Sequence, residues 1–405
     1  MSKDYRSLFE QYKPQQNTYI NYVVQMINYV IDTVGSREPG SPDEHAGQEL
    51  MLNDLKNYCD SVDFEYFQVH PKALLGWVVI DAFLLIAATF FYNMNYRLIS
   101  FFCSLASVVI LFFEFILYWE FVDFLFPKKT SSNVVGIRKP TGEVKRRAIF
   151  NGHTDSNYEW WYNYLGGGHC LALVVVLGLA GAVISLILQI ILYKEYTTWY
   201  ATLQLCFLPA YAALLFFTNW NEVVPGANDN LTGSVAAMAV AKYLADNDIR
   251  FENTEVRVVL TGCEESGLRG SKAYVKAHPP DDIETAFFAF DTLRDLSDMA
   301  IYTRDLTGTV QHDLRVCNIM KRAGQLGGLD LPFRTLFFGA SDAAAQSQGG
   351  IPAGLFAAMD PTPASYYHTR RDTQDNLEPI AIGHGLDVAV GSLFIFNEEG
   401  LSGSN

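Results

Sequence analysis

The sequence VVLTGCEESGLRGS, at residues 258–271, decides the fold more than any other stretch. It begins as a β-branched apolar run, which predicts a buried strand. The strand stops at two adjacent carboxylates, Glu264 and Glu265, and glycines follow at 267 and 270. Ligands of open α/β sheets bind at the carboxyl ends of the strands, and two buried carboxylates there are costly unless something binds them. A Glu-Glu pair on its own is more often part of a solvated turn, so the rest of the chain must show whether this pair belongs to a binding site.

Strands alternate with helices through most of the remaining chain. The strands at 133–138 and 147–151 are expected to form a hairpin around a turn at 140–143. Alternation of this kind predicts an α/β fold with three layers, α/β/α, around a mixed, mostly parallel sheet. Further strands are expected at 64–69, 286–290, 334–338 and 354–358, and helices at 17–34, 41–59, 231–245, 312–324 and from 379.

Four long apolar runs interrupt this pattern in two pairs. Residues 73–92 and 98–119 form the first pair, and residues 170–192 and 200–218 form the second, with the turn 193–196 between its members. Each run is about long enough to cross a bilayer, so two transmembrane hairpins are predicted, with four buried core helices as the alternative. The predicted organisation is a soluble domain in three pieces, 1–72, 127–168 and 219–405, separated by hairpins at 73–126 and 169–218.

The first pair of apolar runs carries two further signals. Asp81 and Glu114 are its only charges, and they are either a functional pair or two carboxyls satisfied by helix ends and hydrogen bonds. The aromatic cluster at 118–126, followed by two lysines, is typical of a membrane–water interface.

Charge and cysteine content restrict the class of protein. The formal net charge of −15, without a basic patch, argues against a nucleic-acid partner. The six cysteines include no CxxC pair, which is consistent with a reducing compartment, and residues 1–6 do not resemble a signal peptide. The positive-inside rule therefore favours a multi-pass protein with its catalytic domain on the cytoplasmic side. The flanking cations are Lys72, Lys128, Lys129, Arg138 and Lys139, against Arg97 and Lys194 in the short turns.

Five potential metal ligands stand at strand ends or in the loops that follow them. Mixed imidazole and carboxylate ligands suit zinc, cobalt or manganese, and a shared carboxylate can bridge two ions. Glu264, next to a ligand, is placed to act as a general base, and Asp155 to hold an imidazole in one tautomer. The five candidate ligands are His153, Asp229, Glu265, Asp291 and His368.

The order of these motifs resembles peptidase family M28, which contains zinc aminopeptidases and glutamate carboxypeptidases. The resemblance covers residues 15–70, 130–160 and 220–400. It implies two zinc ions, the first held by His153, Asp291 and Asp229, and the second held by Glu265, His368 and Asp229, with Glu264 as general base. The matching motifs are Gly152–Ser156, Gly226–Asn230, Glu264–Ser271, Asp291 and His368–Thr373.

The chain departs from the family pattern at two positions. Ala343 stands where the family commonly has histidine after Ser-Asp, and Phe338 stands where many family aminopeptidases have tyrosine. The substrate pocket and the donor to the oxyanion therefore stay open. Arg370 or Arg371 could supply that donor, although a structural salt bridge is the alternative for both.

The expected function is that of a membrane-embedded two-zinc exopeptidase, an aminopeptidase acting on peptides. The alternatives are a carboxypeptidase, an N-acyl amino acid amidohydrolase, and an inactive binding protein with the same fold. Because the second hairpin lies between His153 and Asp229, which must meet at one metal, we expect all four spans to meet beside an active site near the membrane surface.

Overall fold

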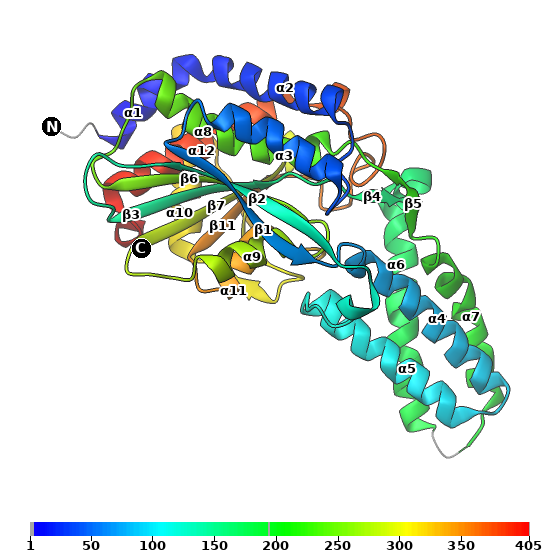
Figure 1. Ribbon diagram of the computed structural model, residues 1–405. Coiled ribbons are helices and arrows are strands. Elements are labelled where there is room, and N and C mark those ends of the chain that lie inside the picture. Colours follow the sequence, from blue (N-terminus) through cyan, green and yellow to red (C-terminus); the bar gives the residue numbers. More distant parts are fainter. Residues whose placement is uncertain (1–3, 193–194, 405) are drawn as a thin grey trace.

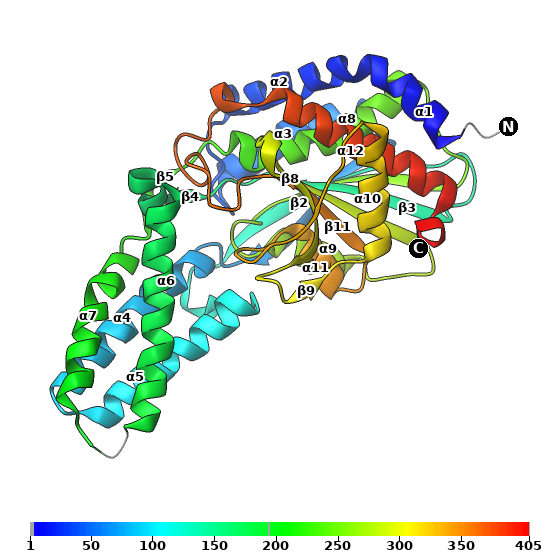
Figure 2. The same cartoon turned by 180° about the vertical axis from the view of Figure 1, so that it is seen from behind.

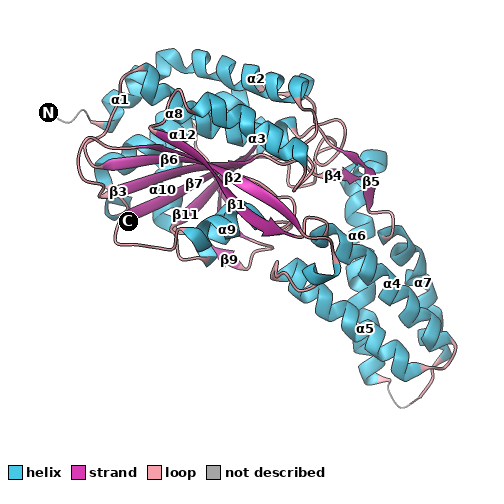
Figure 3. Cartoon of the chain, viewed as in Figure 1, coloured by secondary structure: helices cyan, strands magenta, loops and turns pink. Residues whose placement is uncertain are grey.

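The computed structural model describes residues 4–192 and 195–404. An α/β domain carries a bundle of helices that projects from one end of it, and both termini lie at the opposite end (Figures 1 and 2). Helices cover both faces of the central sheet (Figure 3). The predicted three-layer fold with a mixed, mostly parallel sheet is therefore confirmed.

Nine strands form the central sheet. Its four inner strands, in the order β6, β3, β7 and β11, are mutually parallel, and antiparallel pairs flank them on both sides. The carboxyl ends of the four parallel strands therefore meet at one edge of the sheet. The full order is β1 (Ser61–Val69), β2 (Lys129–Arg138), β6 (Thr254–Thr261), β3 (Arg146–His153), β7 (Glu284–Leu293), β11 (Ala353–Ala358), β8 (Met299–Asp305) and β10 (Phe333–Thr335), with β9 (Val310–Gln311) pairing with β8.

The predicted hairpin of β2 and β3 is wrong in its pairing. β6 lies between the two strands, antiparallel to β2 and parallel to β3. The turn between β2 and β3 hydrogen-bonds to the segment that leads into β6, through Thr141 to Phe251 and Gly142 to Glu252. These bonds hold the turn over the end of β6, so β6 occupies the position that local pairing would have closed.

Two hydrophobic cores lie between the helices and the two faces of the sheet. The larger core lies under α12, α8, α2 and α10, and the smaller one lies under α9 and α11. Apolar residues at helical spacing predict α2, α8 and α12, whose buried faces form most of the larger core. The bounds are α1 (Tyr5–Tyr12), α2 (Gln16–Thr33), α3 (Pro42–Leu55), α8 (Thr232–Asp246), α9 (Arg269–Ala277), α10 (Leu314–Leu326), α11 (Asp342–Gln348) and α12 (Pro379–Glu399).

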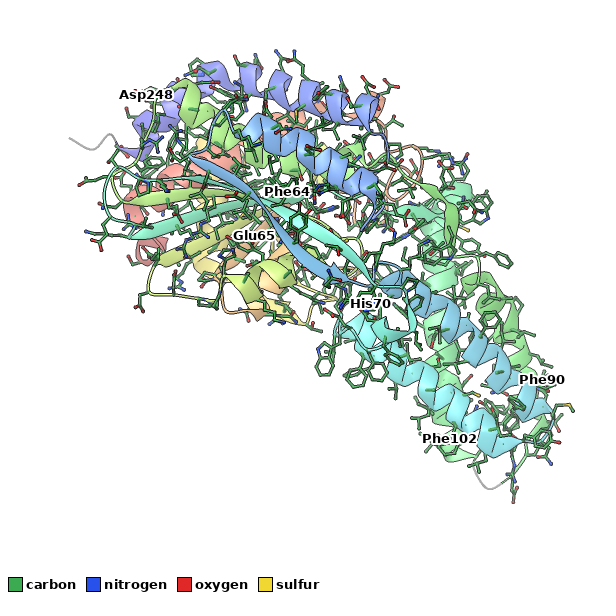
Figure 4. All side chains as sticks on the ribbon, viewed as in Figure 1. Phe64, Glu65, His70, Phe90, Phe102 and Asp248 are labelled. Atoms are coloured by element: carbon green, nitrogen blue, oxygen red, sulfur yellow. The ribbon has the colours of Figure 1, made fainter. Side chains whose placement is uncertain are left out.

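The four apolar runs form the helical bundle. It comprises α4 (Ala73–Asn93), α5 (Arg97–Leu111) with a wider turn at Phe112–Ile116, α6 (Trp161–Ile191) and α7 (Thr198–Leu214). The small sheet of β4 (Tyr158–Trp160) and β5 (Thr218–Val223), next to the start of α6, was not predicted. Apolar side chains cover the outside of the bundle, as Phe90 and Phe102 show near its far end (Figure 4).

Four helices among the described residues are long and apolar enough to cross a membrane. Three of them coincide with spans that the sequence predicted. These three are α4, α5 extended to Ile116, and α6. The fourth is α12, whose apolar stretch is 83% buried inside the protein, because it packs between the sheet and the outer helices. The predicted fourth span is shorter than expected, since α7 has 17 residues and the chain enters β5 at Thr218. Tyr193 and Lys194, in the predicted turn, lie outside the described residues.

Candidate metal centre

The fold brings the seven predicted site residues to one edge of the sheet. His153 ends β3, and Glu264 and Glu265 follow β6. Asp229 lies in the loop before α8 and His368 in the loop before α12, and both side chains are buried. Asp291 lies inside β7, which continues to Leu293, rather than just after a strand as the sequence indicated.

Two groups of potential ligand atoms share Asp229. His153, Asp229 and Asp291 form one group, and Asp229, Glu265 and His368 form the other, with the atoms of each group within 4.8 Å of one another. His153 Nε2 lies 3.2 Å from Asp229 Oδ1, and His368 Nε2 lies 3.0 Å from Asp229 Oδ2. The grouping is the one that the resemblance implied for two ions with a shared carboxylate.

Asp155 supports both the histidine and the glutamate pair. Its carboxylate accepts the backbone N–H groups of Glu264 and Glu265, at 3.1 and 3.0 Å. Its Oδ1 also lies 3.4 Å from His153 Nδ1, on the side of the ring away from Asp229. Asp155 therefore fixes the imidazole with Nε2 toward the shared carboxylate. Glu264 Oε2 lies 3.7 Å from that same Nε2.

Burial and mutual repulsion shift the pKa values of the acidic groups. Burial raises the pKa of Glu264 well above its ordinary value, and the neighbouring carboxylate of Glu265 raises it further. Burial, and then Asp229, raise the pKa of Asp291 to about 8. For Asp229, burial also opposes ionisation, but hydrogen bonds from His153 and His368 outweigh it and lower the pKa. The cluster concentrates more negative charge than its two imidazoles can balance.

The donor set fits divalent zinc. Buried carboxylates without paired cations are costly, and Asp229 Oδ2 and Glu265 Oε1 are buried and both face the same nitrogen, His368 Nε2, at 3.0 Å, whose single N–H cannot fully satisfy both oxygens. Two imidazoles and three carboxylates in two groups provide the nitrogen and oxygen ligands that zinc takes.

Three residues that the sequence did not indicate complete the surroundings of His368. Asn157 donates to Glu265 Oε2 at 2.7 Å and lies 3.0 Å from His368 Nδ1. The Tyr367 ring stacks on the imidazole at 3.9 Å, and Trp160 meets it edge-on at 4.3 Å. These contacts fix the ring orientation. Asn157 directly follows the motif Gly152–Ser156 in the sequence, and this position is the one signal in the sequence that could have indicated it.

Arg37 ties together the two loops that carry His153 and Asp229. It is fully buried, and its guanidinium donates to the carbonyls of Thr154, Pro225 and Gly226 at 2.6, 2.8 and 3.0 Å, and to that of Gly35 at 2.9 Å. Because Arg37 joins the carbonyls of Thr154, Pro225 and Gly226, the arrangement of the ligand loops depends on it.

Arg37→Met is expected to lower the free energy of unfolding by about 3–5 kcal/mol, because it leaves several buried carbonyls without donors. It should also reduce the bound metal, since the two ligand loops lose their common support. Thermal unfolding and metal content measure the two effects, with Arg315→Met, on the exposed side of α10, as control. Unchanged values for Arg37→Met would contradict this role.

The positions left open by the sequence have different outcomes. Arg370 is bound to Glu159 by hydrogen bonds of 2.8 and 2.6 Å, which is a structural ion pair. Phe338 packs against Phe115 of the bundle at 5.4 Å. Ala343 is buried in the smaller core.

Asp81 and Glu114 show no contact with each other in the described part of the chain. Glu114 accepts the backbone N–H of Val122 at 2.7 Å. Asp81 lines a cavity, and its Oδ1 has no hydrogen-bond partner among the described atoms. The two carboxyls are therefore separate features and do not form the functional pair considered above.

One cavity of about 1080 Å³, counting its part open to the surroundings, joins the metal-ligand groups to the interior of the bundle. Both helical hairpins contribute to its walls. The order of the ligands along the chain predicted this juxtaposition. Bundle residues that line it include Trp77 and Val78 of α4, Phe115 after α5, Val175 and Leu179 of α6, and Leu214 of α7.

The fold and the two ligand groups define a zinc exopeptidase type of α/β domain. Residues 213–392 match the model of peptidase family M28, which confirms the resemblance over the segment that carries four of the five candidate ligands. A search of curated proteins gives no match.

Solved structures with the same fold include two aminopeptidases. The aminopeptidase from Aneurinibacillus sp. strain AM-1 is 15% identical, with a TM-score of 0.56 and 93% of each chain covered. BSAP, a zinc aminopeptidase from Bacillus subtilis, is 14% identical, with a TM-score of 0.55 over 93% of this chain and 94% of that one. The family match supports a zinc-dependent peptidase, a hydrolase, and these neighbours show that the fold is the same.

The same fold also occurs in enzymes of another reaction class. Glutaminyl cyclase from Bacteroides thetaiotaomicron is 11% identical, with a TM-score of 0.55, and covers 93% of this chain and 97% of that one. At such identities the likeness shows the fold alone, so the reaction must be argued from the site.

Proposed function

We propose that this protein is a membrane-embedded exopeptidase with two zinc ions, which acts as an aminopeptidase on peptides. The observation that carries the proposal is the pair of ligand groups sharing Asp229, with Glu264 beside them at the mouth of a cavity. A separate carboxylate next to a complete ligand set is what hydrolysis needs, since a proton must leave the attacking water and reach the leaving amine.

Each residue of the centre has a defined role in this proposal. His153, Asp291 and Asp229 hold one zinc ion, and Glu265, His368 and Asp229 hold the other. When bound, two such ions polarise a carbonyl and lower the pKa of a water.

Glu264 is the residue that moves the proton, and the loop that carries it is fixed by Asp155. Glu264 accepts a proton from the attacking water and passes it to the leaving amine. Asp155 keeps this loop in place through the two backbone N–H groups described above.

The inner end of the cavity favours an aminopeptidase over an endopeptidase, because buried side chains of the bundle lie beyond it. Beyond Asp81 the bundle interior is filled by Leu85, Ala182 and Tyr211, which are all buried and belong to one cluster. A substrate can therefore place only its terminal group in the cavity, while the rest of the chain must leave toward solvent. This arrangement suits removal of one terminal residue at a time.

The membrane part of the proposal rests on the bundle. α4, α5 and α6 have the length and composition of spans, and α7, at about 26 Å, is somewhat shorter than the hydrocarbon core. Lys72, Lys128 and Lys129 flank the base of the first hairpin, and they support a cytoplasmic catalytic domain. Arg138 does not contribute to this charge asymmetry, because it is buried at the opposite end of β2 and binds backbone carbonyls.

Digestion of a mixed peptide library by the detergent-purified protein tests this function. Mass spectra should show ladders shortened from the amino end, absent with a chelator. Ladders from the carboxyl end would assign a carboxypeptidase. Loss of ammonia from amino-terminal glutamine without ladders would assign a cyclase, and no reaction on any peptide with zinc bound would contradict the proposal.

Tyr118 is our candidate for the missing donor to the developing oxyanion. It follows α5 and lines the cavity together with Glu264 and Glu265. In this proposal it performs the role of the tyrosine that many family aminopeptidases have at the position of Phe338. Its φ of 51° lies in the left-handed region, which non-glycine residues rarely adopt. Lys272 donates to its backbone carbonyl and helps to hold that conformation.

Tyr118→Phe is expected to lower kcat by about 10²-fold with little change in KM, because one hydrogen-bond donor to the transition state is lost. Steady-state kinetics on a short peptide measures both constants. Tyr96→Phe, in the exposed turn between α4 and α5, is the matched control. Full activity of Tyr118→Phe would exclude the tyrosine as donor.

A further inference from the structure

The cavity at the metal centre is an apolar channel that ends inside the helical bundle. One end holds His153, Asp229 and Glu264, and the other end holds Asp81 of α4. Between them the walls are aliphatic and aromatic, with Val78, Val175 and Leu179 among them. The free energy of binding in an apolar cavity of this kind is favourable for an apolar occupant, because both surfaces are then removed from water.

The depth of the channel exceeds the length of natural side chains. Leu74 and Asp81 both line it and lie seven residues apart on α4, which corresponds to roughly 10 Å of helix rise. An extended chain covers about 3.3–3.6 Å in three bonds, so this depth takes roughly eight to ten carbon atoms. Natural apolar side chains extend by about three to five bonds, or roughly half of that depth.

The blind end decides which part of the substrate enters. Leu85, Ala182 and Tyr211 close the bundle beyond Asp81, so the occupant must end there. In an aminopeptidase substrate, the group that ends close to the scissile carbonyl, on the side away from the leaving amine, is the side chain of the terminal residue, and in an N-acyl amino acid it is the acyl chain.

We propose that this cavity binds a long unbranched apolar chain on the acyl side of the scissile amide, so that the natural substrate is a lipid-like amide. The proposal rests on the proposed function and names its substrate class. The chain is either the side chain of an amino-terminal residue with a free α-amine or the fatty acyl group of an N-acyl amino acid. The bundle places this chain within the membrane and leaves the leaving group on the side of the α/β domain.

Two matched substrate series test the proposal, at concentrations below micelle formation. One series contains anilides of 2-aminoalkanoic acids, and the other contains N-acyl amino acids, both with chains of four to fourteen carbons. We expect kcat/KM to rise about fourfold per added methylene, up to roughly eight to ten carbons, and then to stop rising. The series that is cleaved identifies the source of the chain.

Variants of α6 separate the cavity from partition into detergent. Val175 lines the channel, whereas its neighbour Val176 is 60% exposed on the outer face. Val175→Trp should lower the ratio of kcat/KM for ten-carbon over four-carbon substrates at least about tenfold, and Val176→Trp should leave the ratio unchanged. Equal ratios in both variants, or no dependence on chain length in wild type, would overturn the proposal.

Binding provides a readout that needs no turnover. Alkyl hydroxamates of the same lengths are titrated into the zinc-loaded Glu264→Gln variant, with and without Val175→Trp. Affinity that rises to about ten carbons and falls with Val175→Trp supports the chain site even if no amide is cleaved, in which case only the proposed function fails. Affinity independent of length, or tighter binding of a lysine hydroxamate than of its uncharged analogue, would overturn it, the latter because Asp81 would then select a cation.

Discussion

Glu264→Gln is expected to lower kcat for peptide hydrolysis by about 10²–10⁴-fold while both zinc ions stay bound. Glutamine has nearly the same shape but cannot accept and return a proton. Glu264 is not needed in either ligand group, so the loss should not extend to the metal. The backbone N–H of residue 264 would still bind Asp155, and the loop should keep its position.

Single-turnover kinetics and zinc content measured on the same sample check this prediction. Glu49→Gln, on the exposed side of α3, controls for the change of charge. A variant that retained near wild-type kcat would show that another group moves the proton. A variant that lost zinc would show that Glu264 is a ligand.

Asp229→Ala is expected to remove both zinc ions and to lower activity by about 10³-fold or more. Asp229 is the only residue common to the two ligand groups, so its loss opens both. Asp291→Ala belongs to one group and should release one ion while His368 and Glu265 keep the other. The contrast between the two variants distinguishes a shared carboxylate from two independent sites.

Zinc content after gel filtration measures this difference directly. We expect close to zero ions for Asp229→Ala and close to one for Asp291→Ala. Equal zinc content in the two variants would contradict the sharing. Circular dichroism spectra like that of the wild type would exclude unfolding as the cause.

The elements that the sequence predicted are those with strong local patterns. The apolar run Val258, Val259 and Leu260 marks β6 as a buried strand, and apolar residues at helical spacing mark α2 and α8. The position of β6 between β2 and β3 was not predictable, because it depends on bonds from Thr141 and Gly142 to residues more than 100 positions away. Local pattern contains no information about such contacts.

The residues of the candidate site also divide into those that local sequence motifs indicate and those that only the fold brings to the site. His153, Glu265 and His368 stand in motifs with a recognisable order, so the sequence indicates them. Arg37 lies in a loop rich in glycine and proline, and its role comes from carbonyls of segments remote in sequence. Tyr118 belongs to an aromatic cluster that indicated a membrane interface, and only the packing of the bundle places it beside Glu264.

The central claim is that two zinc ions share Asp229 at the mouth of the channel. An anomalous-scattering map of crystals of the zinc-loaded protein, collected on both sides of the zinc edge, tests it most directly. We predict two peaks about 3.5–4 Å apart, with Asp229 between them, His153 and Asp291 on one side and His368 and Glu265 on the other. A single peak, or two peaks that do not share Asp229, would contradict the account.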